Sequence, residues 1–186
     1  MKDKEIHDPT GAVQGVLQLQ YQISCQLLDI HLAGLEDDEY DWRPASIGLH
    51  LVNESGVWRA DWPESEGYEI GPASIAWLTW HIIFWWSMVL DHSFGDGTLK
   101  RENIRCPGSA KEAVNKILQL KKKWEASVDQ LSDNELNDCA RTKWPFNDKP
   151  FYELSAWLNL ELMKNAAEIG YCRFLYASHK EENARQ

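Results

Sequence analysis

The feature that most restricts the fold is the apolar run IAWLTWHIIFWWSMVL, from Ile75 to Leu90. It is shorter than the roughly 20 residues that a membrane-spanning helix needs, and it contains a central histidine, His81. A helix that is apolar on all of its sides is normally buried inside a protein. We therefore predict a buried helix of a soluble protein and no membrane span.

Four long helical segments are predicted, and residues that start or stop helices bound them. Ser109 and Glu112 form the pattern of a capping box, Thr10 can cap the first helix, and Pro150 suits a first helical turn. Gly34 stops the first helix. The predicted helices are Thr10 to about Ala33, Ser74 to about Phe94, Ser109 to about Leu131, and Lys149 to about Ser178. The apolar spacing of the first helix comes from Val13, Val16, Leu17, Leu27, Leu28 and Ile30.

A long connection, Glu36–Ala73, separates the first two helices. Within it, the runs Gly48–Val52 and Val57–Trp62 flank the turn residues Asn53-Glu54-Ser55-Gly56, which predicts a small β-hairpin. A connection of this length inside a compact domain often covers a functional cleft. A second irregular stretch, Ser132–Asp148, precedes the last helix.

These elements indicate an all-α fold. We predict a four-helix bundle whose long crossover between the first and second helices carries the hairpin, in a single domain over residues 1–186. Ten tryptophans favour an aromatic-lined interior or cleft, because a buried indole N–H needs a partner. The candidates to line such a pocket are Trp42, Trp58, Trp62, Trp77, Trp80, Trp85, Trp86 and Trp157.

The charge of the chain excludes some partners. The formal net charge of -10 repels phosphate backbones, so we expect no binding to nucleic acid. The basic run Lys121–Lys123 is interpreted as a solvated helix face. The four cysteines match neither a zinc finger nor a compact disulfide framework, and the N-terminal sequence lacks the apolar core of a signal peptide. We therefore expect free thiols and a cytoplasmic location.

A line of polar residues on the last helix is a candidate site. Glu161, Asn165 and Glu168 are spaced i, i+4 and i+7, so a helix places them in one row beside an apolar stripe that should face the core. The row is open to three interpretations: a ligand-binding row, a hydrogen-bonded core feature, or the border of the solvated face. The apolar stripe consists of Leu158, Leu162 and Ile169.

His81 is the residue most worth comparing with this row. It lies in the middle of the second helix between Trp77 and Trp85, so its face should be buried. One interpretation is a core histidine bonded to a backbone group or a carboxylate. The other is a metal ligand, with Glu161 and Asn165 supplying the rest. An amide oxygen suits Ca²⁺ or Mg²⁺ and is a poor ligand for zinc.

Other candidates carry weaker signals. His92 follows His81 by eleven residues and so lies ~16 Å away along a helix, too far to share one metal. His50 could swing over a cleft but is interpreted as an ordinary hairpin residue. Cys172 has no histidine spaced to lower its pKa and is interpreted as a buried structural thiol.

Several stretches resemble the DinB-like (YfiT-like) superfamily, which is related to the metal-binding domain of mycothiol-dependent maleylpyruvate isomerases. SIAWLTWHI is similar to its second-helix pattern, in which a Trp four residues before a histidine opens the ligand face. ELMKNAAEIGYCRFLYA is similar to its last-helix pattern, and VWRADWPE and DHSFGDG resemble one branch of the group. The resemblance implies a bundle that often forms homodimers.

The resemblance also implies a divalent metal, zinc or nickel, bound by three residues at one end of the core. Such a metal lowers the pKa of a bound thiol or water. His81 matches the first ligand and Glu161 the second. The third position is Asn165, where the family pattern has histidine, and the preceding residue is Lys164, a cation that disfavours a metal.

This departure leaves three outcomes: the metal is lost, it is held weakly by His81, Glu161 and Asn165 with waters, or His50 or Glu168 completes the set. We expect loss or weak binding. Two functions follow. One is a metal-dependent thiol-transferase or hydrolase-like enzyme with a degraded metal site. The other is a non-catalytic bundle without metal, which binds a small apolar or aromatic ligand or acts in stress response.

Overall fold

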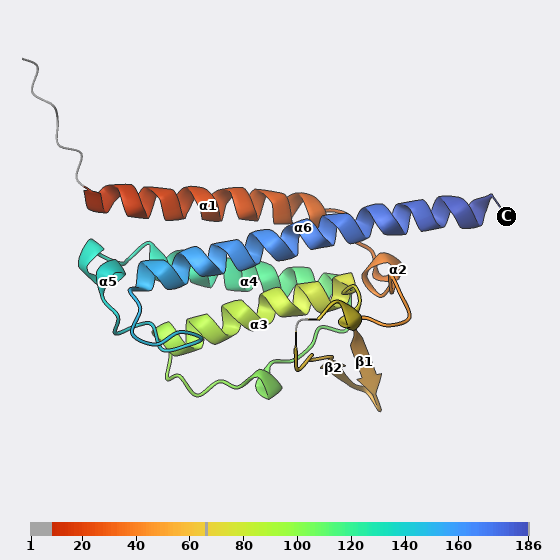
Figure 1. Cartoon of the computed structure of the whole chain (residues 1–186), viewed down its shortest axis with the longest axis horizontal. Helices are drawn as coiled ribbons and strands as arrows, with labels where there is room; N and C mark the ends of the chain where they lie inside the picture. Colours follow the sequence, from red (N-terminus) through yellow and green to blue (C-terminus); the bar gives the residue numbers. More distant parts are fainter. Residues whose placement is uncertain (1–8, 66, 186) are drawn as a thin grey trace, which may run out of the picture.

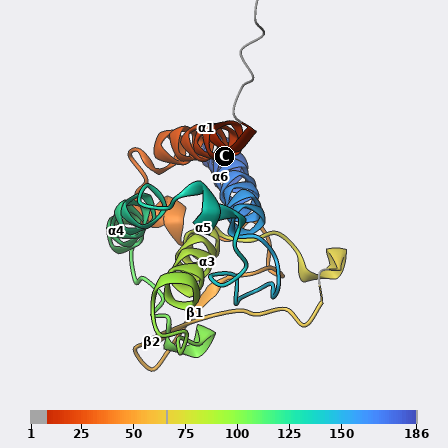
Figure 2. The same cartoon turned by 90° about the vertical axis from the view of Figure 1, so that its left-hand side faces the viewer.

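The computed structural model describes residues 9–65 and 67–185 (Figure 1). In these ranges α1 packs along α6, and α3 packs against both α4 and α6. Figure 2 looks along this bundle, with α1 and α6 adjacent on one side and α3 and α4 on the other. The predicted all-α bundle is confirmed. Its long helices are α1 (Pro9–Leu32), α3 (Ile75–Phe94), α4 (Ala110–Val128) and α6 (Phe151–Ala184).

Serine side chains cap two of the long helices, and Ser109 does so as predicted. Ser74 Oγ accepts a hydrogen bond from the backbone N–H of Trp77, and Ser109 Oγ accepts one from that of Glu112. The capping box predicted at Ser109 is only half formed, because the Glu112 carboxylate accepts from the backbone N–H of Gly108 at 3.0 Å, one residue earlier. α1 begins at Pro9, so position 10 already belongs to the helix. The side chain of Thr10, the predicted cap, is not among the side chains that the structure describes.

The ends of two helices differ from the prediction. α4 ends at Val128, before Leu131, and α6 continues past Ser178 to Ala184. The last part of α6 extends beyond the end of α1 in Figure 1, where Trp42 packs its ring against Tyr176 at 5.6 Å. Beyond Ser178 the apolar periodicity ends, and α6 extends further because its residues have helix propensity and because Trp42 packs on Tyr176 just before this end.

The apolar run Ile75–Leu90 lies in the core of the bundle as part of α3. Most residues of α3 are buried, and Ile83 and Val89 are fully inaccessible to solvent. The prediction of a buried helix is confirmed. Within the described ranges, no helix combines the length and apolar character needed to cross a bilayer.

The apolar residues of α1, predicted to share one face, include both buried and exposed side chains. Leu17 and Leu28 are buried against the bundle, whereas Val13, Val16 and Ile30 are exposed. Val16 and Ile30 lie on a different side of the helix from Leu17 and Leu28, because 3.6 residues make one turn, whereas Val13 is one turn before Leu17 on the same side.

The connection between α1 and α3 contains α2 (Asp37–Tyr40) and the predicted hairpin. Strands β1 (Leu51–Glu54) and β2 (Val57–Ala60) pair antiparallel and are shorter than expected. β1 also begins and ends later than predicted, so Asn53 and Glu54 belong to the strand and not to the turn. The turn at Ser55 and Gly56 has φ angles of 54° and 88°, as a two-residue type I′ turn requires. The short 3-10 helix η1 (Tyr68–Ile70) leads into α3.

The stretch predicted as irregular between α4 and α6 contains one more helix, α5 (Asp133–Asn137). Ser132 caps it, and the Glu135 carboxylate accepts a hydrogen bond from the Ser132 backbone N–H at 3.0 Å. This capping box was present in the sequence but was not recognised. Another 3-10 helix, η2 (Arg101–Asn103), lies in the segment between α3 and α4.

Candidate functional site

A cavity of about 880 Å³ lies between α3, α6 and the long connection. His81 lines it from α3, and Glu161 and Asn165 line it from α6. The connection contributes Leu49 and residues 62–65 and 70–73 to the wall, and further residues of α3 and α6 complete it. The three residues predicted as metal ligands therefore line one cavity.

His81 is held by hydrogen bonds at both ring nitrogens. The indole N–H of Trp85 donates to Nε2 over 2.8 Å, and Nδ1 lies 3.0 Å from Oδ1 of Asn165. An indole N–H can only donate, so Nε2 is an acceptor and the ring proton is placed on Nδ1, which donates to Asn165. Trp77 stacks on the imidazole with ring centroids 4.5 Å apart. The histidine is thus fixed in one tautomer and one orientation.

Asn165 connects this histidine to the backbone of its own helix. Its Nδ2 donates to the carbonyl oxygen of Glu161 over 2.7 Å. A carbonyl oxygen can only accept, so the amide must present its oxygen to His81. Asn165 is 1% exposed, and both ends of its amide are satisfied.

The Glu161 carboxylate does not take part in this chain of hydrogen bonds. Its Oε2 lies 2.7 Å from Nζ of Lys164, and the side chain of Glu161 is 19% exposed. The lysine beside the expected metal position therefore forms an ion pair with the expected acidic ligand. Among the described residues, no group of three or more His, Cys, Asp and Glu side chains is placed to hold a metal ion.

Two further candidates lie at the same cavity. Glu168 lines it, and burial raises the pKa of its carboxyl, an effect that Lys164 opposes. Cys172 donates to the carbonyl of Ala73 at 3.3 Å, and burial raises the pKa of its thiol to about 11. A protonated, buried thiol is a poor nucleophile, as the structural interpretation of Cys172 expects.

The histidines of weaker signal lie elsewhere. His50 is buried in the connection and does not line the cavity, so the structure does not bring it to Glu161 or Asn165. His92 lies near the end of α3, where its Nε2 is 3.1 Å from the carbonyl oxygen of Leu99.

Aromatic side chains form much of the cavity wall. Of the eight tryptophans proposed for a pocket, Trp62, Trp77 and Trp85 line this one. Trp77 also donates its indole N–H to the carbonyl of Asp61 at 2.7 Å, which fixes the connection to α3. Trp80 and Trp86 are buried core residues.

Sequence reasoning missed Trp85 as a partner of His81. The signal was available, because the two residues are four apart on a helix and a half-buried indole N–H needs an acceptor. Trp85 had instead been counted as part of an apolar face.

The arrangement defines a class of protein: a four-helix bundle with a polar site on facing helices, covered by a long crossover. A family model described as the DinB superfamily matches residues 20–169, from within α1 to within α6. The chain belongs to the DinB superfamily. Searches of curated proteins and of solved structures gave no significant match.

Proposed function

We propose that this DinB-superfamily protein binds a small apolar or aromatic molecule in the cavity between α3 and α6, without a catalytic metal. The observation that carries the proposal is the hydrogen bonding of His81. Both of its ring nitrogens are engaged, by Trp85 and by Asn165. A metal needs a free lone pair on a ring nitrogen, so coordination would have to break one of these bonds.

The other two donors fit a divalent metal no better. Asn165 offers a neutral amide oxygen that already accepts from His81, and Glu161 is paired with the ammonium of Lys164. Catalytic zinc sites use three imidazole, carboxylate or thiolate ligands and leave one position open. The donor set supports a site in which hydrogen bonds have replaced the metal.

The cavity itself suits an organic ligand. Its volume of about 880 Å³ is within the range of small-molecule sites, roughly 300–1,000 Å³. Trp62, Trp77 and Trp85 offer apolar surface, while Lys164 and Glu168 supply polar groups on α6. Such a pocket takes a flat apolar body and orients it by a few polar contacts.

A metal-dependent thiol-transferase or hydrolase-like enzyme is the second candidate. It is favoured by the convergence of His81, Glu161 and Asn165 on one cavity. Metal analysis separates the two functions. We expect the purified protein to contain no stoichiometric metal and its melting temperature to be unchanged by a chelator. Stoichiometric metal that is lost in His81→Ala would overturn the proposal.

Two variants test whether hydrogen bonds block the metal. Asn165→His restores the imidazole of the family pattern, and Trp85→Phe frees Nε2 of His81. We expect the double variant Trp85→Phe/Asn165→His to take up zinc where the parent takes up none. An apo double variant at saturating zinc would show that His81 hydrogen bonding is not what excludes the metal.

Ligand binding is measured separately with the neutral aromatic probe N-phenyl-1-naphthylamine. We expect probe fluorescence to rise on binding and Ala167→Phe to abolish the rise, because Ala167 lines the cavity. Ala177→Phe is the matched control, since Ala177 is exposed on the same helix and does not line the cavity. Failure to bind the probe or a panel of aromatic metabolites would contradict the ligand-binding function.

The proposal also covers location and assembly. All four cysteines, Cys25, Cys106, Cys139 and Cys172, are described and free, which supports a reducing cytoplasm. We propose that two copies of the chain pair as a homodimer.

A further inference from the structure

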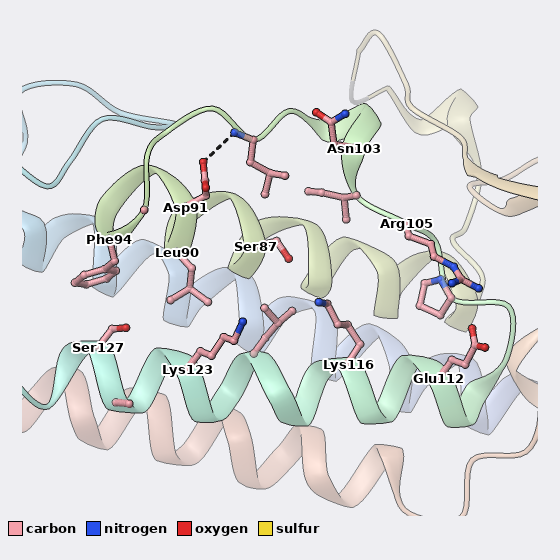
Figure 3. Close-up of a pocket in the computed structure, with 16 residues that line it drawn as sticks. Ser87, Leu90, Asp91, Phe94, Asn103, Arg105, Glu112, Lys116, Lys123 and Ser127 are labelled. Atoms are coloured by element: carbon pink, nitrogen blue, oxygen red, sulfur yellow. Dashed lines mark hydrogen bonds between the residues drawn. The ribbon is translucent and has the colours of Figure 1, made fainter.

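A second groove, of about 800 Å³, lies between α3 and α4 under the segment that joins them. Figure 3 shows the two helices and the covering segment with its lining side chains. No residue lines both this groove and the cavity between α3 and α6. The groove is therefore a separate feature of the bundle.

Apolar side chains make up a large part of the groove lining. Leu120 is buried on the α4 side, and half-buried side chains from α3 and from the covering segment surround it. Along α4 the lining runs from Glu112 to Ser127, which at 1.5 Å per residue is about 22 Å. The space is therefore long, and an elongated molecule can fill it. The other apolar side chains of the lining are Leu90, Phe94, Leu99, Ile104, Pro107 and Ala126.

Three cations border this apolar surface. Lys116 and Lys123 rise from α4 toward α3 in Figure 3, and Arg105 reaches the groove from the covering segment. The two lysines are seven residues apart, so they lie on one side of the helix with about 10 Å between them along its axis. In the described part of the chain, none of the three cations has a carboxylate oxygen within 4.0 Å.

The two carboxylates of the groove are already used by the backbone. Asp91 Oδ2 accepts from the N–H of Leu99 at 2.9 Å, as the dashed line in Figure 3 marks. Glu112 Oε2 accepts from the N–H of Gly108 at 3.0 Å. Both acidic groups thus hold the covering segment to the helices. The groove is lined by three cations and two carboxylates, and both carboxylates accept hydrogen bonds from backbone N–H groups. The groove is therefore locally basic in a chain whose net charge is -10.

We propose that this groove binds an elongated aliphatic carboxylate, a fatty-acid-type anion. The apolar walls take the hydrocarbon chain, since removing methylene groups from water favours binding. The carboxylate accepts hydrogen bonds from Lys116 or Lys123, whose own stems lie along apolar surface while their ammonium groups stay at the edge. Charge complementarity selects the anion, because the rest of the protein repels it.

Calorimetry with dodecanoate below its micellar concentration tests the proposal on the full chain. Dodecyltrimethylammonium, which has the same tail and the opposite charge, is the comparison ligand. We expect dodecanoate to bind one to one and about tenfold more tightly than the cation. Tighter binding of the cation would overturn the proposal, since general attraction to an acidic protein would then dominate.

Charge reversal locates the site. Lys116→Glu/Lys123→Glu should weaken dodecanoate binding about tenfold or more, because two cations are replaced by anions at the groove. The matched control is Lys111→Glu/Lys122→Glu, two exposed lysines of the same helix that do not line the groove. We expect the control to bind within about twofold of the parent. Equal weakening in both double variants would contradict a site in the groove.

A third variant separates the groove from the cavity of the proposed function. Lys164→Glu changes the charge at that cavity and leaves the groove intact. We expect Lys164→Glu to bind dodecanoate as the parent does. Loss of binding in Lys164→Glu, with binding retained in Lys116→Glu/Lys123→Glu, would place the anion in the cavity and overturn the inference. Binding of N-phenyl-1-naphthylamine tests the cavity independently of either result.

Discussion

Asn165 uses the two ends of its amide for opposite purposes. The oxygen accepts from His81 on another helix, and the nitrogen donates to the carbonyl of Glu161 one turn back. The two bonds satisfy the oxygen and the nitrogen of the buried amide, and a buried polar group left without a partner costs about 1–3 kcal/mol. The amide therefore contributes to the joint between α3 and α6 as well as to the site. A polar residue inside this bundle is explained by hydrogen bonding alone.

His50 presents the reverse situation, a buried polar ring whose nitrogens make no hydrogen bond of standard geometry among the described residues, the backbone of Ala45 being only a weak partner. It is 4% exposed. Burial, followed by the positive charge of Arg43, lowers the pKa of His50 from its ordinary 6.5, and Asp61 and the backbone of Ala45 oppose the shift. The ring is therefore harder to protonate in the folded protein than in the unfolded chain.

This difference predicts a loss of stability in mild acid. Below pH 6.5 the unfolded chain takes up a proton at His50 while the folded protein resists it, so the free energy of unfolding falls. One proton accounts for at most about 1.4 kcal/mol per pH unit. His50→Phe removes the titrating group, and we expect its free energy of unfolding to fall less steeply between about pH 7 and pH 5. Urea denaturation at a series of pH values measures the slope.

His179→Phe serves as the control, because His179 is exposed near the end of α6. It should keep the pH dependence of the parent. Parallel curves for the parent and His50→Phe would show that His50 does not contribute.

Much of the site could be predicted from residue spacing, and the rest depended on how two helices meet. The row Glu161, Asn165 and Glu168 and the burial of His81 follow from helical periodicity. The contact between Asn165 and His81 does not, because these residues are 84 positions apart and their distance depends on the packing of α3 against α6. The contact between Trp85 and His81 could have been predicted from their spacing of four residues, but it was missed.

Among the elements, the side chain of Arg173 links α6 to the end of α1. The Nη1 of Arg173 donates to the carbonyls of His31 and Ala33 at 2.9 and 2.8 Å, and its Nε donates to Glu39 at 2.9 Å. These carbonyls belong to the last turn of α1 and the residue that follows it, where the helix leaves them without backbone partners. Arg173 thus caps one helix from another and holds α2 beside them.

Arg173→Met is expected to lower the free energy of unfolding by about 2 kcal/mol, because hydrogen bonds to charged groups contribute about 1.5–3 kcal/mol and the aliphatic stem is kept. The side chain of Arg173 is 26% exposed, so solvent screens the Glu39 pair only in part. Urea denaturation of parent and variant measures the difference.

Arg185→Met is the comparison, since Arg185 pairs with Glu181 near the exposed end of the same helix. An exposed pair contributes little, and we expect a change below about 0.5 kcal/mol. Equal effects of the two substitutions would show that the contacts of Arg173 add nothing beyond a surface ion pair.

The elements themselves were largely predictable, since long helices begin and end at local signals. Ser109 caps α4 as the sequence predicts, and α3 begins directly after Ser74, where its start was expected. α5 was missed because a single short turn of helix has too few residues for a periodic pattern, although its capping box at Ser132 was present. The two faces of α1 were merged because apolar residues on an outer face and on a core face look alike in a sequence.

At the scale of the whole molecule, the outer face of α1 is unusual for a monomer. Val16, Leu19, Ile23 and Ile30 are 47–66% exposed. At 100° per residue they fall within about 60° of one another, on the side opposite the buried Leu17, Ser24 and Leu28. A helix packed on one face normally turns polar residues outward. A row of exposed aliphatic side chains on that face indicates a surface that another protein covers.

The occupant we propose is a second copy of the chain, as the family resemblance implies. A stripe along one helix can pair with itself about a two-fold axis, so that each copy buries the same residues. Each copy has a net charge of -10, so the two copies repel each other. Association is favoured only where the burial of apolar surface outweighs this repulsion, which favours a specific contact over aggregation. The face lies away from α3 and α4, which leaves the groove between them open in a dimer (Figure 2).

Placing charge in the stripe should separate the copies. Leu19→Lys/Ile23→Lys introduces two ammonium groups at the centre of the expected contact, where each would be desolvated without a partner. We expect light scattering to give twice the chain mass for the parent and a single chain mass for this variant. Gln18→Lys/Gln22→Lys carries the same added charge on exposed neighbouring positions outside the stripe and should remain dimeric. Because both variants change only exposed side chains of α1, each should keep the circular dichroism of the parent. A monomeric parent, or equal masses for the two variants, would mean that the α1 stripe does not join two copies.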